Sequence, residues 1–172
     1  MNLGVFIVLG LLIGCTNQKE DTSTENVDQG DSGTMINGSG LGNLSFRFAM
    51  DTDYMAAMDE PAVGNFYGSI YLGEDVSGVG PNDGAEALTS LLVENITLPT
   101  DGSSTEVLLT VEDLPATEIV VLGFMDSDGN ADPDNPNPDA KDPVTLPSDN
   151  DFDVIEDQTT ESRIYFAFLN PS

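Results

Sequence analysis

The stretch "EIVVLGFM", residues 118–125, decides the fold of this chain. Its side chains are almost all apolar at odd and even positions alike, so a β-strand formed by it would bury both faces. Its length is usual for a strand and short for a helix. The stretch runs directly into "DSDGN", residues 126–130, which consists of turn-forming residues. We therefore interpret residues 118–125 as a central strand that ends at Met125.

Five further stretches alternate apolar and polar residues in the manner of half-buried strands. They are "LSFRFAM" (44–50), "NFYGSIYL" (65–72), "SLLVENITL" (90–98), "TEVLLTVEDL" (105–114) and "RIYFAFL" (163–169). The side chains expected to face the core are Phe46, Phe48, Met50, Phe66, Ile70, Leu72, Leu92, Ile96, Leu98, Val107, Leu109, Val111, Ile164, Phe166 and Phe168. Turn-forming residues separate the runs. Residues 43–172 therefore predict a mainly β fold, an antiparallel β-sandwich of about six or seven strands.

Two segments are compatible with short helices. "NDGAEALTSLL", residues 82–92, begins with a plausible cap at Asn82 or Asp83 and continues with good helix formers. It predicts one or two helical turns before the next strand. "DYMAAMDE", residues 53–60, could add a single turn.

The longer stretch "DLPATEIVVLGFMDSDGN", residues 113–130, resembles a recurrent sequence of transthyretin-like, or carboxypeptidase-regulatory-like, sandwich modules of secreted bacterial proteins. The matching residues are Leu114, Pro115, Asp126, Asp128, Gly129 and Asn130. The Gly-x-Tyr that usually follows the proline is absent, and Thr117-Glu118-Ile119 stands in its place. The resemblance implies an Ig-like or transthyretin-like sandwich and says little about activity.

Composition excludes several classes of function. The 172 residues include 31 acidic and four basic ones, which gives a formal net charge of -27. Such a chain repels nucleic acid, which binds basic surfaces. It has no histidine and a single cysteine, so Ser-His-Asp and Cys-His catalysis and a zinc site of the usual kind are excluded. Some pair of carboxylates could serve a glycosidase, but none stands in an apolar setting. We therefore expect a protein that is not an enzyme.

The first residues have the pattern of an export signal. "MNLGVFIVLGLLIGC" is apolar from Leu3 to Ile13, too short to span a bilayer well. Leu12-Ile13-Gly14-Cys15 resembles the lipobox of bacterial lipoproteins, which implies cleavage before Cys15 and acylation of that residue. The implied location is the bacterial cell envelope, on the outer membrane if the host is Gram-negative, because Thr16 rather than Asp follows the cysteine. A plain secretory signal with a chance cysteine is the alternative.

These features divide the chain into three parts. Residues 1–14 form the predicted signal peptide. Residues 15–42 are polar and acidic, and we interpret them as the lipidated cysteine followed by a disordered tether. Residues 43–172 form the predicted β-domain, which the anchor would hold at the membrane.

A loop rich in aspartate, residues 126–143, is the most distinctive candidate site. Oxygen-bearing side chains recur at alternate positions: Asp126, Asp128, Asn130, Asp132 and Asp134. Calcium takes six to eight hard oxygen ligands, and alternate residues of a curved loop can direct several of them inward. The spacing does not match an EF-hand, since three prolines follow where a helix would begin. The loop predicts a Ca²⁺ site built from these five residues.

Three alternatives remain open. The loop could be a solvated turn without metal, because Asp, Asn, Gly and Pro are ordinary turn residues. A second acidic run, residues 148–157, could add ligands such as Asp149 or Asp151. Finally, Tyr67 and Tyr71 are predicted to point outward from their strand and could bind a glycan or another small ligand.

Overall fold

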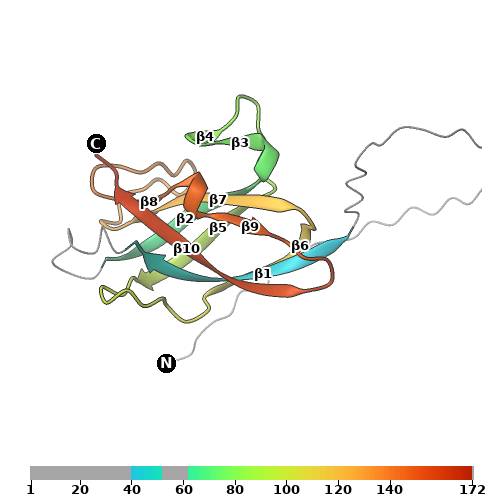
Figure 1. Ribbon diagram of the computed structural model, residues 1–172. Coiled ribbons are helices and arrows are strands. Elements are labelled where there is room, and N and C mark those ends of the chain that lie inside the picture. The colour runs from blue at the N-terminus through green and yellow to red at the C-terminus, as the bar shows by residue number, and fades with distance from the viewer. Residues whose placement is uncertain (1–39, 52–61, 172) are drawn as a thin grey trace, which may run out of the picture. The chain divides into compact units, whose positions relative to one another are not determined.

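The computed structural model describes residues 40–51 and 62–171 (Figure 1). These residues form ten strands and two short 3-10 helices, and they contain no α-helix. The strands are β1 (Leu41–Met50), β2 (Val63–Leu72), β3 (Val76–Ser77), β4 (Gly80–Pro81), β5 (Thr89–Thr97), β6 (Leu109–Pro115), β7 (Glu118–Asp126), β8 (Pro143–Thr145), β9 (Asp151–Asp153) and β10 (Thr159–Leu169). The 3-10 helices are η1 (Gly73–Asp75) and η2 (Pro147–Asp149). The mainly β prediction is therefore confirmed, and β1 begins inside the predicted tether.

Eight strands form one strongly bent sheet in the order β5-β2-β7-β8-β10-β1-β6, and β9 pairs with the start of β7 on the same edge as β8. β3 and β4 form a separate hairpin that projects from this sheet (Figure 1). The prediction of an antiparallel sandwich is wrong in two respects. β1 and β10 pair in parallel, and the short β8 joins both halves into a mixed, nearly closed barrel-like sheet. β7 occupies the central place predicted for residues 118–125.

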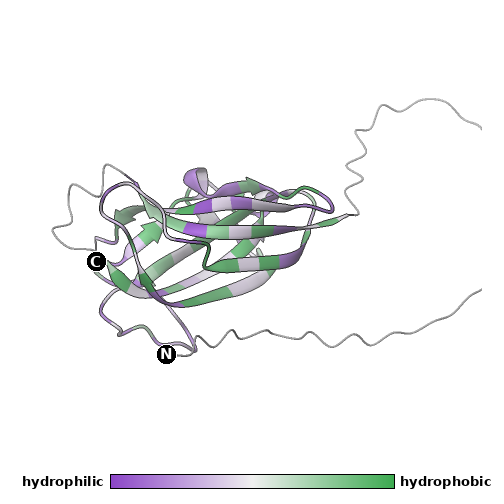
Figure 2. Cartoon of the chain, turned by 90° about the horizontal axis from the view of Figure 1, so that it is seen from below, coloured by the Kyte–Doolittle hydropathy of each residue, from purple (hydrophilic) through white to green (hydrophobic). Residues whose placement is uncertain are grey.

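Phenylalanine side chains hold the two halves of the sheet together. The Phe66 ring of β2 lies 5.0 Å from that of Phe48 in β1 and 5.9 Å from that of Phe166 in β10, in edge-to-face contacts. All three side chains are fully buried, together with Phe46 and Ile164. Figure 2 shows hydrophobic and hydrophilic residues following each other along the strands, as the predicted alternation requires. Burial of these faces supplies most of the driving force for folding.

Two glycines make room for Phe66. Gly68 and Gly123 are opposite each other in β2 and β7. A Cβ atom added to either glycine would overlap the Phe66 ring. The ring therefore occupies the space that two side chains would fill elsewhere in the sheet.

Two equivalent β-bulges interrupt the alternation. In β5, Asn95 has a positive φ of 57°, and its N–H donates to Asn65 Oδ1 at 3.0 Å. In β6, Asp113 has a φ of 59°, and its N–H donates to Asn43 Oδ1 at 3.1 Å. Each bulge inserts one residue opposite a Gly-Asn pair of the neighbouring strand and reverses the inward face.

The bulge in β5 explains the wrong core prediction for Leu92. On β5, Leu91 is buried and Leu92 is half-exposed, although Ile96 and Leu98 are buried as predicted. On β6, Leu109 and Val111 pack against the core as predicted, and Leu114 is buried beyond the bulge. Val107, predicted for the core, is exposed and precedes the strand. When alternation is continued through a bulge, the residues on one side of the bulge are assigned to the wrong face of the sheet.

The two predicted helices have different outcomes. Residues 82–88 are irregular, and β5 begins at Thr89. Gly84 has a φ of 84°, which a right-handed helix does not allow, and the Ala85 N–H closes a turn on the Asn82 carbonyl. The predicted helix at 82–92 is therefore wrong. The predicted turn at 53–60 lies outside the described residues.

Candidate functional site

The acidic loop, residues 126–143, leads from the end of β7 to the start of β8. Asp126, at the end of β7, is buried, and its carboxylate accepts three backbone hydrogen bonds. Oδ1 accepts from the N–H groups of Gly129 (2.8 Å) and Asn130 (3.1 Å), and Oδ2 accepts from that of Ala131 (3.3 Å). This carboxylate therefore folds the first turn of the loop, in the manner of an Asx turn.

Asp142 closes the other end of the loop in the same way. Its buried carboxylate accepts from the N–H and hydroxyl of Ser127 through Oδ1, and from the Asp139 N–H (3.1 Å) through Oδ2. Burial raises the pKa of Asp142, while the hydrogen bonds from Ser127 and Asp139 act in the opposite direction. Backbone hydrogen bonds from Asn170 to Asp142 and from Lys141 to Asn170 attach this end to the C-terminal segment.

Between these anchors, the side chains of Asp128, Asn130 and Asp139 meet. Asn130 Nδ2 donates to Asp128 Oδ2 at 2.8 Å and to Asp139 Oδ2 at 2.6 Å. The second oxygen of Asp139, Oδ1, is buried and has no hydrogen-bond partner among the described residues. A buried oxygen of this kind is costly unless something else satisfies it.

The structure thus divides the five predicted ligands. Asp128 and Asn130 lie in the cluster, whereas Asp126 serves the backbone. Asp132 and Asp134 are exposed, and Asp132 Oδ1 accepts from the Asp134 N–H at 3.0 Å. Sequence reasoning missed Asp139, which lies beyond three prolines and returns to the cluster only through the fold. Within the described part of the chain, no three acidic or cysteine side chains form a complete metal-binding group.

The second acidic run, 148–157, does not meet the acidic loop. Its strand β9 pairs with Glu118–Val120 at the start of β7, whereas the acidic loop leaves the opposite end of β7 at Asp126. Asn150, which is fully buried, bonds through its side chain to the backbone of Leu146 and Tyr165. This run therefore forms part of the sheet, and the fold does not bring Asp149 and Asp151 to the candidate cation site.

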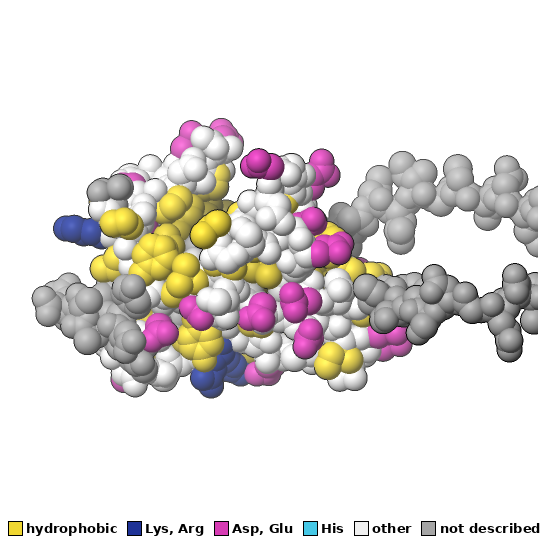
Figure 3. Space-filling model, turned by 45° about the horizontal axis from the view of Figure 1, so that its top comes forward, with side chains coloured by type: hydrophobic (Ala, Val, Ile, Leu, Met, Phe, Trp, Pro, Cys, Tyr) yellow, Lys and Arg dark blue, Asp and Glu magenta, His cyan; other side chains and the backbone are white. Residues whose placement is uncertain are grey.

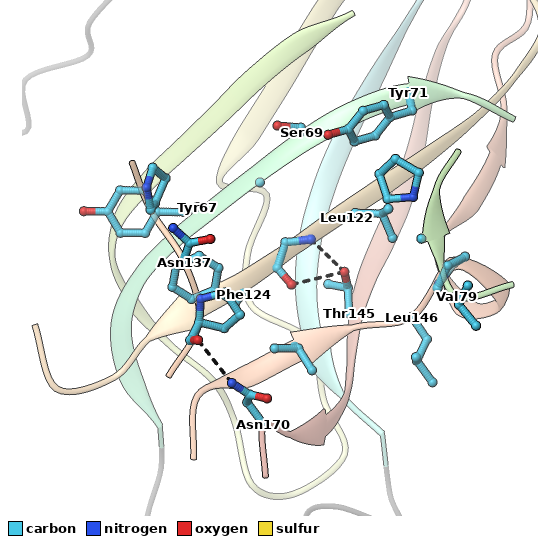
Figure 4. A pocket seen from close by; sticks show the side chains of 18 of the residues that line it. Tyr67, Ser69, Tyr71, Val79, Leu122, Phe124, Asn137, Thr145, Leu146 and Asn170 are labelled. Atoms are coloured by element: carbon cyan, nitrogen blue, oxygen red, sulfur yellow. Dashed lines mark hydrogen bonds between the residues drawn. The ribbon is translucent and has the colours of Figure 1, made fainter. Parts of the chain in front are cut away.

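A groove lies beside the acidic loop, on the outer face of β2, β7 and β8, and has a volume of about 550 Å³. Tyr67 and Tyr71 line it, as does Phe124, the cross-strand partner of Tyr67 (Figure 4). The Tyr67 and Phe124 rings are stacked, with centroids 5.6 Å apart. The outward direction predicted for the two tyrosines is consistent with this position. Phe168, predicted for the core, is half-buried and also lines the groove.

The acidic loop and the groove share a segment. Pro136 and Pro138 form one wall of the groove, and Asp139 follows directly in the cluster of carboxylates. Asn170 Nδ2 donates to the Pro138 carbonyl at 3.1 Å and holds this wall against the C-terminal segment (Figure 4). Figure 3 shows hydrophobic side chains gathered below the β3–β4 hairpin.

No protein-family model matches the chain, and no curated protein or solved structure is significantly similar to it. In residues 40–51 and 62–171, no helix is long and apolar enough to cross a bilayer. Functional assignment therefore depends on the chemistry of the acidic loop and the groove.

Proposed function

We propose that the chain is a lipid-anchored, non-enzymatic module of the bacterial cell envelope, held at the outer membrane through Cys15, whose acidic loop binds one calcium ion. The lipobox-like sequence 12–15 supports the anchor, and the polar segment that follows it supports a tether. The acidic composition and the lack of histidine favour a binding or structural role over catalysis. The transthyretin-like resemblance of residues 113–130 is consistent with an exported module and remains a prediction.

The observation that carries the calcium proposal is the unpartnered Asp139 Oδ1 beside Asp128 and Asn130. A hard divalent cation would satisfy this oxygen and relieve the repulsion between the two carboxylates. The Asn130 amide, which now donates to both carboxylates, can rotate so that its oxygen joins them as a ligand. The residues that would hold the ion are Asp128, Asn130 and Asp139, and water would complete the coordination.

Calcium is expected to raise the melting temperature of the mature chain, prepared with Cys15→Ser so that it remains unacylated. Extracellular calcium modules bind at about 10⁻⁴ to 10⁻³ M. At a concentration ten times the Kd, the ion would stabilise the folded state by about 1.4 kcal/mol, or about 5 °C. Thermal unfolding followed by circular dichroism at constant ionic strength, with and without a chelator, measures this shift. Magnesium at the same concentration is expected to give a smaller one.

The matched pair of variants is Asp139→Asn and Asp132→Asn. Both remove one negative charge from the acidic loop, but only Asp139 belongs to the cluster. We expect Asp139→Asn to reduce the calcium shift by more than half and Asp132→Asn to leave it unchanged. An equal response of the two variants would mean that calcium only screens the loop. No shift in the unsubstituted chain would remove the metal proposal.

The anchor has a separate test in cells. Cys15→Ser is expected to abolish incorporation of labelled fatty acid and to move the protein from the membrane fraction to the soluble fraction, because acyl chains supply the membrane affinity. Thr16→Ser, next to the cysteine, should leave both unchanged. Continued acyl labelling of the Cys15→Ser protein would contradict the proposed anchor.

A further inference from the structure

We infer that the groove on the outer face of β2, β7 and β8 binds a neutral oligosaccharide. This inference goes beyond the proposed calcium site and does not require it. The volume of about 550 Å³ is in the range of small-molecule sites, which combine an apolar lining with a few polar groups. The chemistry of the lining then limits the kind of ligand.

The floor of the groove is an aromatic surface on a rigid support. Tyr67 is fixed by stacking on Phe124, which is itself buried. Tyr71 lies four residues further along β2, at a distance of about 13 Å for an extended strand. Ser69 stands between the two tyrosines, opposite Leu122 of β7 (Figure 4). This spacing is longer than one sugar ring and therefore suits an oligosaccharide.

The two walls come from different parts of the chain. One is the proline segment of the acidic loop, which Asn170 holds in place through the Pro138 carbonyl. The other is the β3–β4 hairpin, whose tip carries Val79, 97% exposed and part of the groove lining. A bound ligand would cover the apolar Val79 side chain and remove it from water.

Charge selects a neutral ligand. Among the described residues, none of those that line the groove is charged, although the chain has a net charge of -27. An anionic ligand would be repelled by the surrounding carboxylates, and a cationic one would find no carboxylate in the groove. The polar groups available are the hydroxyls of Ser69 and the tyrosines and the amides of Asn137 and Asn170.

These groups match a sugar better than a peptide. The C–H face of a pyranose ring packs on an aromatic ring, and its hydroxyls bond to side-chain amides and hydroxyls. An extended peptide would need partners for its own backbone N–H and C=O groups. The groove floor is the face of central strands, whose backbone groups are already paired with neighbours, so strand addition is not available there.

The test is a titration of the ¹⁵N-labelled mature chain (Cys15→Ser) with chitotetraose and with cellotetraose, followed by NMR. We expect the resonances of Tyr67, Ser69 and Tyr71 to shift with at least one of them. Polygalacturonate and a proline-rich peptide are the anionic and peptide probes, and neither is expected to shift these resonances. No shift with either neutral sugar at several millimolar would overturn the inference, as would a preference for the peptide or the polyanion.

The variants are Tyr71→Ala and, as the matched control, Tyr165→Ala, since Tyr165 does not line the groove. Tyr71→Ala is expected to weaken binding at least tenfold and Tyr165→Ala less than twofold. Val79→Ser alters the exposed wall without touching the core and is also expected to weaken binding. It therefore serves as the test if Tyr71→Ala proves unstable. Undiminished affinity in both groove variants would contradict the inference. The titration is repeated in the presence of a chelator, so that sugar binding is measured independently of calcium binding.

Discussion

Replacement of Phe66 by alanine is expected to lower the free energy of unfolding by about 3–5 kcal/mol, the usual cost of removing a buried aromatic side chain. Phe66 is fully buried and contacts Phe48 and Phe166 from the opposite half of the sheet. It also fills the space beside Gly68 and Gly123, so the substitution leaves a cavity on two sides. Because the packed strands cannot collapse into that space, we expect the full cost.

Urea unfolding of the unsubstituted chain, Phe66→Ala and Phe66→Leu measures this effect, with the slope of the transition as a check on two-state behaviour. Phe66→Leu retains much of the volume and should cost less than half as much as Phe66→Ala. A loss below about 1 kcal/mol for Phe66→Ala would show that Phe66 does not join the two halves of the sheet.

Asp126→Ala is expected to cost about 2–3 kcal/mol, even when a chelator removes calcium. The substitution removes the buried carboxylate that accepts from the N–H groups of Gly129, Asn130 and Ala131. Only the Asn130 N–H keeps a second acceptor, Asp128 Oδ1, and a hydrogen bond to a charged group typically contributes about 1.5–3 kcal/mol. The loss is therefore a property of the loop's own hydrogen bonds.

Asp134→Ala is the control, because it removes the same charge from an exposed position in the same loop. We expect it to change stability by less than about 0.5 kcal/mol. Equal losses for the two variants, measured by urea unfolding, would contradict the assigned role of Asp126. Asp126 would then return to the set of candidate cation ligands.

The comparison of sequence and structure shows where local patterns suffice. Alternation of apolar residues located five long strands, and the doubly apolar stretch 118–125 identified the sixth, which lies between two neighbours. Alternation failed at Asn95 and Asp113, because a residue in the left-handed conformation inserts one position and exchanges the two faces. Asparagine and aspartate occur at many positions other than bulges. Only the pairing of the strands therefore reveals where the bulges lie.

The candidate site shows the same division. The sequence predicted an acidic loop after β7 and an outward direction for Tyr67 and Tyr71. Each of these predictions needs only the order of residues within a single strand and the segment that follows it. It did not distinguish Asp126, which holds the loop, from Asp128 and Asn130, which face Asp139. The role of each carboxylate depends on which backbone N–H groups the folded loop presents to it.

Strand content and charge are therefore readable from residues near one another in sequence. The parallel pairing of β1 with β10, the meeting of Asp128 with Asp139, and the walls of the groove are not. The parallel pairing depends on closure of the sheet, which follows from burial of Phe48, Phe66 and Phe166 together. The meeting of Asp128 with Asp139 depends on the backbone hydrogen bonds that Asp126 and Asp142 accept at the two ends of the loop. The hydrophobic effect that drives this burial has no direction of its own, so the complementary shapes of the packed side chains decide which segments meet.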